Sequence, residues 1–378
     1  MSIDPQDDDI RIVESASLPD GPAEVVRFPG VPGFGDVHAA LFSATRDLPQ
    51  GPVLAMGPGA VPTALWVSRS GTTIHHFTDS IAEAQSLAAT LSRHGLAPAP
   101  SVCDWSGDTL ACALALVHLP RGRELQVDYL RFAAYHLKPG AKLIFVGARD
   151  EGIRTAVADA AKLFGRAGVV VRKGGYHVAM AYRPMGEMAR PELAFDAFDV
   201  VVDAVPTRLL SCVGAFAHDR LDGGAAALIQ GMQIVPGTSV LEVGCGTGLV
   251  ALAAARRGAK VLATDVSYRA VASARRTLSA NGYGDVSVDH ACGAASVDDG
   301  SVDVVVTNPP FHQGRDVSFE VSRLFVREAA RVLRPGGQLF LVANAFLDYR
   351  AWLSHHLTAV HTAWENRQYR VWQATKEP

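Results

Sequence analysis

The sequence repeats itself in tandem, and this repeat limits the possible folds more than any other feature. In each half of the chain an apolar run ends in closely spaced glycines, as a buried parallel strand that enters a tight turn should. A Thr-Asp pair follows, and later a Leu-x-Pro-Gly segment leads into another apolar run. Three matches in the same order predict a tandem duplication of one α/β unit. The matched segments are residues 53–59 and 240–246, residues 78–80 and 264–266, and residues 137–146 and 333–342.

The second half shows the alternation of strands and helices that such a unit requires. Alternation at this pitch indicates a parallel, doubly wound sheet with helices on both faces. We therefore predict an α/β protein of two tandem doubly wound, Rossmann-like domains, spanning residues 1–190 and 191–378. Strands are predicted at residues 239–243, 260–264, 303–307 and 338–343, and helices at residues 249–257, 268–281 and 319–333.

Composition favours a soluble protein of a reducing compartment. Hydrophobic residues make up 48% of the chain and charged residues 19%, which is typical of a globular protein. No apolar stretch approaches the roughly 20 residues needed to cross a bilayer, and the acidic start is unlike a signal peptide. The five cysteines never form Cys-x-x-Cys, which indicates reduced thiols and argues against a zinc site. We expect a cytoplasmic monomer that binds neither a metal nor a membrane.

A glycine-rich turn in the second half is suited to a nucleoside ligand. Residues 242–248 read Glu-Val-Gly-Cys-Gly-Thr-Gly between a predicted strand and a predicted helix. The glycines permit a tight turn and let a ligand approach the backbone closely. Their Gly-x-Gly-x-Gly spacing differs from the dinucleotide fingerprint and disfavours NAD. Asp265 ends the next strand, 19 residues after Gly246, where a carboxylate can accept hydrogen bonds from two ribose hydroxyls.

A second motif, Asn308-Pro309-Pro310-Phe311, directly follows the predicted strand 303–307. An exocyclic amine is a poor nucleophile because its lone pair is delocalised into the π system. The side-chain oxygen of Asn308 and the carbonyl of Pro309 can accept the two amine hydrogens and so direct the lone pair toward a methyl donor. The prolines stiffen the loop, and Phe311 offers a flat face on which a base can stack. We predict these four residues to be catalytic.

The two motifs together resemble those of the class I S-adenosylmethionine-dependent methyltransferases, over about residues 216–342. The resemblance implies that the glycine turn holds the methionine end of S-adenosylmethionine and that Asp265 binds its ribose. It also implies a segment before the first strand that folds over the cofactor. The implied cofactor-binding residues are Phe216, Asp222, Glu242, Gly244, Cys245, Gly246, Gly248, Asp265, Val266, Cys292 and Asn308.

The first half lacks the parts that carry this chemistry. Residues 57–60 read Gly-Pro-Gly-Ala, without a third glycine, and residues 118–121 read His-Leu-Pro-Arg where Asn-Pro-Pro-Phe should fall. Asp79 matches Asp265 in the repeat, and we interpret it as a residue kept for helix capping. We therefore predict a degenerate N-terminal methyltransferase-like domain that serves binding or rigidity.

Longer segments narrow the substrate. Residues 307–314 and 342–349 resemble those of the ribosomal RNA guanine-N2 methyltransferases, and in the branch acting on small-subunit rRNA an inactive domain precedes the active one. The resemblance implies methyl transfer to the N2 amine of a guanine, with rRNA or the assembled small subunit as partner. Four alternatives remain open: guanine in large-subunit rRNA, adenine N6, a protein glutamine, or a non-catalytic RNA-binding assembly protein.

Overall fold

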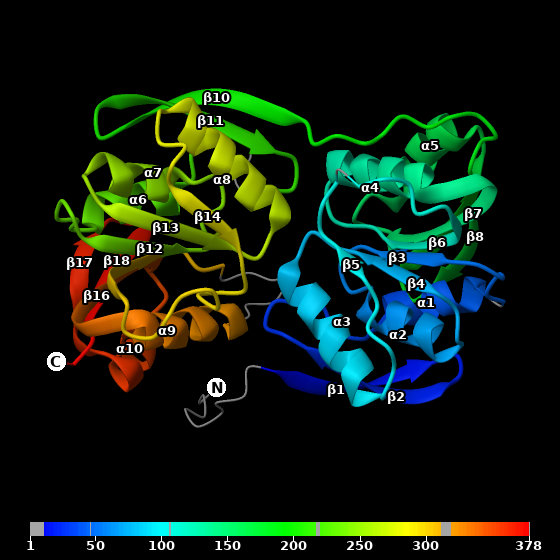
Figure 1. Ribbon diagram of the computed structural model, residues 1–378, viewed down its shortest axis with the longest axis horizontal. Coiled ribbons are helices and arrows are strands. Elements are labelled where there is room, and N and C mark those ends of the chain that lie inside the picture. Colours follow the sequence, from blue (N-terminus) through cyan, green and yellow to red (C-terminus); the bar gives the residue numbers. More distant parts are fainter. Residues whose placement is uncertain (1–10, 46, 106, 217–219, 311–318, 378) are drawn as a thin grey trace. The chain divides into compact units, whose positions relative to one another are not determined.

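The computed structural model describes residues 11–45, 47–105, 107–216, 220–310 and 319–377. The chain divides into two compact units, and the division falls between Leu193 and Ala194. We call them the N-terminal unit and the C-terminal unit. Figure 1 shows that each unit consists of a sheet covered by helices. No helix among the described residues is long and apolar enough to cross a membrane.

The N-terminal unit starts with an antiparallel hairpin, β1–β2, and continues as a seven-stranded sheet in the order β5-β4-β3-β6-β7-β9-β8. The first five strands of this order are parallel, and β9 pairs antiparallel with both β7 and β8. Its elements are β1 (Ile12–Leu18), β2 (Gly21–Arg27), α1 (Asp36–Ala44), β3 (Val53–Met56), α2 (Val61–Arg69), β4 (Ile74–Phe77), α3 (Ile81–Arg93), β5 (Ser101–Val102), β6 (Cys112–His118), α4 (Arg123–His136), β7 (Leu137–Ala148), α5 (Ile153–Phe164), β8 (Ala167–Lys173) and β9 (Tyr176–Tyr182).

The C-terminal unit has the same plan. It starts with the hairpin β10–β11 and continues as a sheet in the order β14-β13-β12-β15-β16-β18-β17. Its elements are β10 (Phe195–Val202), β11 (Val205–Cys212), α6 (Gly223–Gly231), β12 (Ser239–Val243), α7 (Leu249–Arg256), β13 (Lys260–Asp265), α8 (Tyr268–Ala280), β14 (Ser287–His290), β15 (Val302–Thr307), α9 (Glu320–Val332), β16 (Leu333–Asn344), α10 (Arg350–His356), β17 (Thr358–Glu365) and β18 (Tyr369–Thr375).

The matching strand orders confirm the duplicated α/β fold predicted from the sequence. The hydrogen bond between the hairpin and the helix after the second parallel strand is also present in both units. In the N-terminal unit the backbone N–H of Val26 donates to Oγ1 of Thr90 on α3, at 2.9 Å. In the C-terminal unit the N–H of Leu210 donates to Oγ1 of Thr277 on α8, at 3.1 Å. In both units the hairpin is therefore hydrogen-bonded to a threonine of the helix that follows the second parallel strand.

The prediction of a parallel sheet was incomplete at one edge. In the C-terminal unit β18 pairs antiparallel with both β16 and β17, and in the N-terminal unit β9 pairs in the same way with β7 and β8. No helix lies between β17 and β18, so these two strands are joined by a short turn as an antiparallel hairpin. A helical crossover, which would make them parallel, is absent between them. The sheets are mixed, with a parallel core that carries the predicted motifs.

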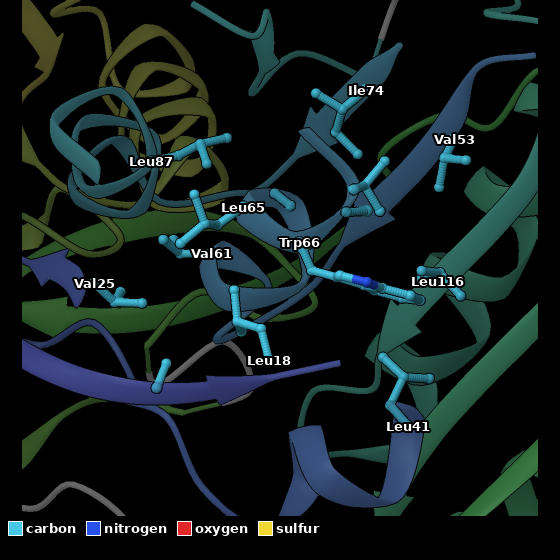
Figure 2. Packing of buried hydrophobic residues seen from close by; sticks show 14 of the residues in the cluster. Leu18, Val25, Leu41, Val53, Val61, Leu65, Trp66, Ile74, Leu87 and Leu116 are labelled. Carbon is cyan, nitrogen blue, oxygen red and sulfur yellow. The ribbon is translucent and has the colours of Figure 1, made fainter. Parts of the chain in front are cut away.

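Each sheet is held to its helices by buried aliphatic side chains. Figure 2 shows part of the N-terminal core, where Trp66 of α2 extends toward Leu116 of β6 and Leu41 of α1 lies nearby. In the C-terminal unit all residues of α7 up to Ala255 are buried, because this helix follows the glycine turn into the interior. The rigid parallel strands then fix the positions of the loops at their carboxyl ends.

Candidate active site

The glycine turn joins β12 to α7 at the carboxyl edge of the C-terminal sheet. Gly244, Gly246 and Gly248 have φ angles of +78°, +53° and +79°, a region that favours glycine. A Cβ at Gly248 would come within 2.9 Å of Ala274, so this glycine lets α7 pack against α8. A Cβ at Gly246 would meet no described atom within 4 Å. The middle of the turn therefore faces open space, where a ligand can approach its backbone.

Asp265 lies at the end of β13 and holds the turn in place. Its Oδ2 accepts the N–H of Gly246 at 2.9 Å, and its Oδ1 accepts the N–H of Ser267 at 2.8 Å. Burial raises the pKa of this carboxyl, while the two backbone donors oppose that shift. A carboxylate oxygen accepts more than one hydrogen bond, so both oxygens retain capacity for hydroxyl donors.

Glu242 and Cys245 lie behind the turn. The carboxylate of Glu242 is only 4% exposed and accepts the N–H of Ala251, in the first turn of α7, at 2.7 Å. Burial raises its pKa well above the ordinary value. The side chain of Cys245 packs in the hydrophobic cluster between α7 and α8. Glu242 therefore supports the helix N-terminus, and Cys245 presents its backbone to the turn.

Asn308 follows β15, the strand next to β12, and is half-buried. Its Nδ2 donates to Oδ2 of Asp222 at 2.8 Å. Asp222 is also the N-cap of α6, since the same oxygen accepts the N–H of Ala225 at 2.7 Å. A carboxylate can only accept hydrogen bonds, so the amide must turn its NH₂ group toward Asp222 and its carbonyl oxygen away. The arrangement leaves Oδ1 of Asn308 as the acceptor that it offers to a ligand.

Two residues that support this contact were not singled out from the sequence. A Cβ at Gly224 would come within 3.0 Å of both polar atoms of the Asn308 side chain. A Cβ at Gly223 would come within 2.8 Å of the ring of Tyr369. The Asp-Gly-Gly start of α6 therefore makes room for Asn308 and for β18. The consecutive glycines at a helix start were the sequence signal for this close approach.

The proline loop after Asn308 is hydrogen-bonded to helix α9 through Pro310. Pro309 is buried and Pro310 is exposed. The carbonyl of Pro310 accepts the hydroxyl of Ser322 on α9 at 3.3 Å, and Ser322 in turn is hydrogen-bonded to the hydroxyl of the buried Tyr349 at 3.0 Å. This chain fixes the loop to α9. Phe311, the last predicted catalytic residue, lies outside the described residues.

The remaining predicted cofactor residues lie at the same edge or beside it. Val266 follows Asp265 and is 37% exposed, and its carbonyl accepts Nε2 of His290 at 2.9 Å. Cys292 is buried, and burial raises the pKa of its thiol to about 11, so it is a neutral wall residue. Phe216 is 65% exposed in the segment that leads into α6.

One part of the predicted alignment between the two units is wrong, namely the match of Asp79 with Asp265. Strand register pairs Met56 with Phe77 as it pairs Val243 with Thr264, so Thr78, rather than Asp79, matches Asp265. Thr78 even repeats a contact of Asp265, because its hydroxyl accepts the N–H of Ser80 at 3.0 Å. The sequence comparison missed this because it aligned identical letters across a one-residue shift.

The side chain of Thr78 is shorter than that of Asp265, and the carboxylate of Glu83 on α3 lies beside it. Its Oε1 accepts the N–H of Ala60 at 2.8 Å, and its Oε2 accepts the hydroxyl of Thr78 at 2.9 Å. Burial raises the pKa of this carboxyl to about 7. The carboxylate thus occupies the glycine turn from inside the protein.

Asp79 does not cap a helix, since the N-cap of α3 is Ser80. Instead, Asp79 accepts hydrogen bonds from Nε1 of Trp105 at 2.9 Å and from the hydroxyl of Tyr129 at 2.8 Å. His118 stands where Asn308 stands in the other unit and is buried, 2.9 Å from Oγ1 of Thr63. The polar positions of this copy are therefore engaged with the protein's own side chains.

Comparison with known proteins identifies the family. The sequence model of the family described as "Methyltransferase small domain" matches residues 206–373. The chain is 34% identical over 261 residues to the ribosomal RNA small subunit methyltransferase C of Hahella chejuensis, covering 68% of this chain and 76% of that protein. This chain belongs to the ribosomal RNA small subunit methyltransferase C family. The protein of the same description from Pseudomonas aeruginosa strain LESB58 is 33% identical, over 74% of this chain and 84% of its own.

A solved structure extends the likeness to both units of this methyltransferase C family member. The T. thermophilus 16S rRNA N2 G1207 methyltransferase, in complex with AdoMet and guanosine, superimposes with a TM-score of 0.84 and 28% identity. The match covers 97% of this chain and 98% of that one. The family, the two-unit fold and the assignment as a methyltransferase that were predicted from the sequence are thus confirmed.

Proposed function

We propose that this chain transfers a methyl group from S-adenosylmethionine to the exocyclic N2 amine of a guanine in small-subunit ribosomal RNA. The relatives are named ribosomal RNA small subunit methyltransferase C, and the T. thermophilus structure is that of a 16S rRNA N2 G1207 methyltransferase with AdoMet and guanosine. The structural observation that carries the proposal is the amide of Asn308, whose NH₂ group is held by Asp222 and whose oxygen therefore faces away from that carboxylate.

The residues at the carboxyl edge of β12 and β13 fit the cofactor. The open backbone at Gly246 is the place for its methionine end, supported by Gly244, Gly248, Cys245 and Glu242. The Asp265 carboxylate suits ribose hydroxyls, and Val266 and Cys292 offer apolar contacts for adenine. Bound there, S-adenosylmethionine supplies an electrophilic methyl group on its sulfonium. Phe216 lies on the segment that would cover it.

The chain's own groups then act on the amine. Oδ1 of Asn308 and the carbonyl of Pro309 accept the two hydrogens of the guanine amine, so the nitrogen lone pair points toward the methyl group. The same acceptors stabilise the positive charge that develops on nitrogen. Asp222 strengthens this effect, because its hydrogen bond polarises the Asn308 amide. The methylated amine afterwards loses its proton to water, so no strong base is required.

The base must leave its helix for this contact. A guanine amine lies in the minor groove of a duplex, and two acceptors cannot surround it while the base is stacked and paired. The target is therefore unpaired or flipped out, which costs a few kcal/mol. Phe311 is the aromatic face that we expect to receive it.

Nucleoside mass spectrometry tests the proposal. Small-subunit rRNA from cells that lack the gene should lose one N2-methylguanosine, and the purified chain should restore it with S-adenosylmethionine. If the purified chain instead forms N6-methyladenosine, or methylates large-subunit rRNA, the substrate is another RNA site. Methylglutamine in a peptide digest of ribosomal proteins would assign a protein substrate. A chain that binds S-adenosylmethionine but methylates none of these would support the non-catalytic alternative.

A further inference from the structure

Helix α8 is hydrogen-bonded to the backbone of β11 and of the residue after it through four side chains on one helix face. Among the described strands β11 pairs only with β10, and Figure 1 shows this hairpin lying along α8. Four residues of a helix rise about 6 Å and two residues of a strand span about 6.8 Å, so such a face stays in step with alternate strand residues. The four side chains, spaced four positions apart, are those of Arg269, Ser273, Thr277 and Asn281.

Three of these contacts replace the hydrogen bonds that a neighbouring strand would make. They reach every second residue of β11, because the N–H groups of alternate residues point to the same edge. The N–H of Arg208 donates to Oδ1 of Asn281 at 3.2 Å, that of Leu210 to Oγ1 of Thr277 at 3.1 Å, and that of Cys212 to Oγ of Ser273 at 3.1 Å. They satisfy backbone donors that would otherwise be left inside the protein.

The N-terminal unit has the same three contacts. Its helix α3 corresponds to α8, since each has 13 residues and follows a serine N-cap. The equivalent contacts join Phe28 to Ser86 at 3.0 Å, Val26 to Thr90 at 2.9 Å, and Glu24 to His94 at 2.7 Å. We call these three contacts, in either unit, the shared contacts. Because both units have them, they serve the fold rather than the chemistry of one unit.

The fourth contact belongs to the C-terminal unit. Arg269 is the second residue of α8, and its Nη1 donates to the carbonyl of Val213 at 2.6 Å. The second residue of α3 is Ala82, whose methyl group can donate no hydrogen bond. The N-terminal unit therefore forms the same hairpin and the same helix with an alanine at this position.

Arg269 is also unfavourable for its own helix. The side chain is only 1% exposed, and burying a cation costs free energy even where it is hydrogen-bonded. A positive charge in the first turn of a helix is opposed by the helix dipole. A residue that breaks two local preferences, and that the duplicated fold does not need, indicates a task specific to this unit.

The contact of Arg269 fixes the turn that carries Phe216. Val213 is the first residue after β11, and the N–H of Ala215 donates to the carbonyl of Cys212 at 3.1 Å to close the turn. Ala215 is buried, whereas the next residue, Phe216, is 65% exposed. The guanidinium therefore anchors the backbone three residues before an exposed aromatic ring.

The other end of this connection is the carboxylate that we expect to bind the ribose. Arg269 lies two residues after Ser267, whose N–H donates to Oδ1 of Asp265 at 2.8 Å. We propose that Arg269 is a positioning residue that holds Phe216 against S-adenosylmethionine bound at Asp265. The proposal rests on the proposed function for the place of the cofactor, and it adds a residue that acts on the cofactor through the backbone of Val213.

Replacement of Arg269 in the full-length chain tests the proposal. Arg269→Met keeps an apolar stem of similar length and removes the donors. It should weaken S-adenosylmethionine binding about tenfold in calorimetry, within the range for a lost hydrogen bond to a charged group. The kcat at saturating cofactor should stay close to that of the unmodified chain, because Asp222 still holds Asn308. Arg269→Lys, which keeps a cationic donor, should lose less affinity.

The matched control is Thr277→Val, which removes one of the shared contacts from the same helix face. It should lower the melting temperature and leave cofactor affinity unchanged. An equal loss of affinity in this control would show that any loosening of the hairpin has the same effect, and would overturn the proposal. Unchanged affinity in a folded Arg269→Met chain would overturn it as well.

A double-mutant cycle with Phe216→Ala gives a second, independent test. Phe216 is exposed, so its removal should leave folding intact and weaken cofactor binding. If Arg269 acts through Phe216, adding Arg269→Met to Phe216→Ala should cause little further loss. Fully additive losses, or unchanged affinity in Phe216→Ala, would overturn the proposal. Arg269→Lys takes the place of Arg269→Met in the cycle if the latter does not fold.

These measurements use the cofactor without RNA. Failure of the proposed function therefore has a different signature, because the effects on S-adenosylmethionine binding would remain while the unmodified chain formed no N2-methylguanosine.

Discussion

Nδ2 of Asn308 and the backbone N–H of Ala225 donate to the same oxygen of Asp222, at 2.8 and 2.7 Å. One carboxylate thus fixes both the start of α6 and the orientation of the amide at the predicted catalytic position. A neutral side chain at residue 222 would allow the Asn308 amide to rotate by half a turn. The carbonyl oxygen would then no longer be held toward the substrate.

Asp222→Asn should therefore lower kcat by about tenfold, less than the roughly 100-fold loss for deleting a preorganised transition-state contact, because Asn308 itself is still present. Asparagine is as good an N-cap as aspartate, so thermal stability should change little. Steady-state methylation assays measure kcat, and calorimetric titration with S-adenosylmethionine measures the affinity for the cofactor. A variant that loses cofactor affinity as strongly as turnover would show that Asp222 acts on the cofactor, as the family resemblance implied. Ser80→Ala, which removes the N-cap of α3, is the control for a loss of capping alone.

Asn308→Ala should bind S-adenosylmethionine normally and lose at least ~100-fold in turnover, the scale for deleting one preorganised transition-state contact. The reason is that we expect Oδ1 of Asn308 to accept a hydrogen of the substrate amine, whereas the glycine turn that we expect to hold the methionine end of the cofactor follows β12. Single-turnover methylation of rRNA measures the loss. An Asn308→Ala enzyme of near-normal rate would remove the amine clamp from the mechanism.

Asp265→Ala should weaken S-adenosylmethionine binding by about 1.5–3 kcal/mol, the scale for hydrogen bonds to a charged group. The substitution also frees the N–H groups of Gly246 and Ser267, which loosens the turn. Thr78→Ala is the matched control in the other unit, because Thr78 is the counterpart of Asp265 there, and it should leave cofactor affinity unchanged. Calorimetry should give one cofactor per chain for the unmodified protein. Two sites, or unchanged affinity in a folded Asp265→Ala protein, would contradict this assignment.

The sequence was sufficient for the parallel core because its signals are local. The apolar runs that become β12 and β15 have a single plausible conformation, and the glycines after β12 fit only a turn with positive φ. The predicted helix at residues 268–281 was correct to one residue, because Ser267 caps its start. Because Asp265 ends one parallel strand and Asn308 follows another, the sequence alone predicts that both lie at the carboxyl edge of the sheet.

The contacts of Asp222 and Glu83 could not be predicted in the same way. Asn308 and Asp222 are 86 positions apart, and only the completed sheet brings them together. Glu83 lies on a helix that reads as an ordinary amphipathic element, and its burial becomes visible only when α3 packs over the turn at Ala60. The misaligned Asp79 has the same cause, because strand register is a property of the sheet and not of the letters.

Glu83 should make the stability of the N-terminal unit depend on pH. Its pKa is about 7 in the folded chain, above the ordinary value of 4.5, so folding favours the protonated form. The stabilisation is fully present below about pH 4.5 and is lost as the pH rises to about 7. The loss over this range is on the order of 3 kcal/mol. Glu83→Gln should remove this dependence in denaturant titrations at pH 5 and pH 8, and an unchanged pH profile would contradict the assignment.

The two units should be separable in function. The C-terminal unit has its own hydrophobic cluster, its own hairpin and all of the predicted cofactor residues. A fragment that begins at Pro191 should therefore fold and bind S-adenosylmethionine with the affinity of the full chain. It should nevertheless methylate small-subunit rRNA far more slowly at low RNA concentration, because we expect the N-terminal unit to supply part of the RNA-binding surface. The deficit should lie in KM for RNA and shrink for a guanosine nucleoside, which needs no such surface. A fragment with the full kcat/KM on rRNA would show that the N-terminal unit does not hold the substrate.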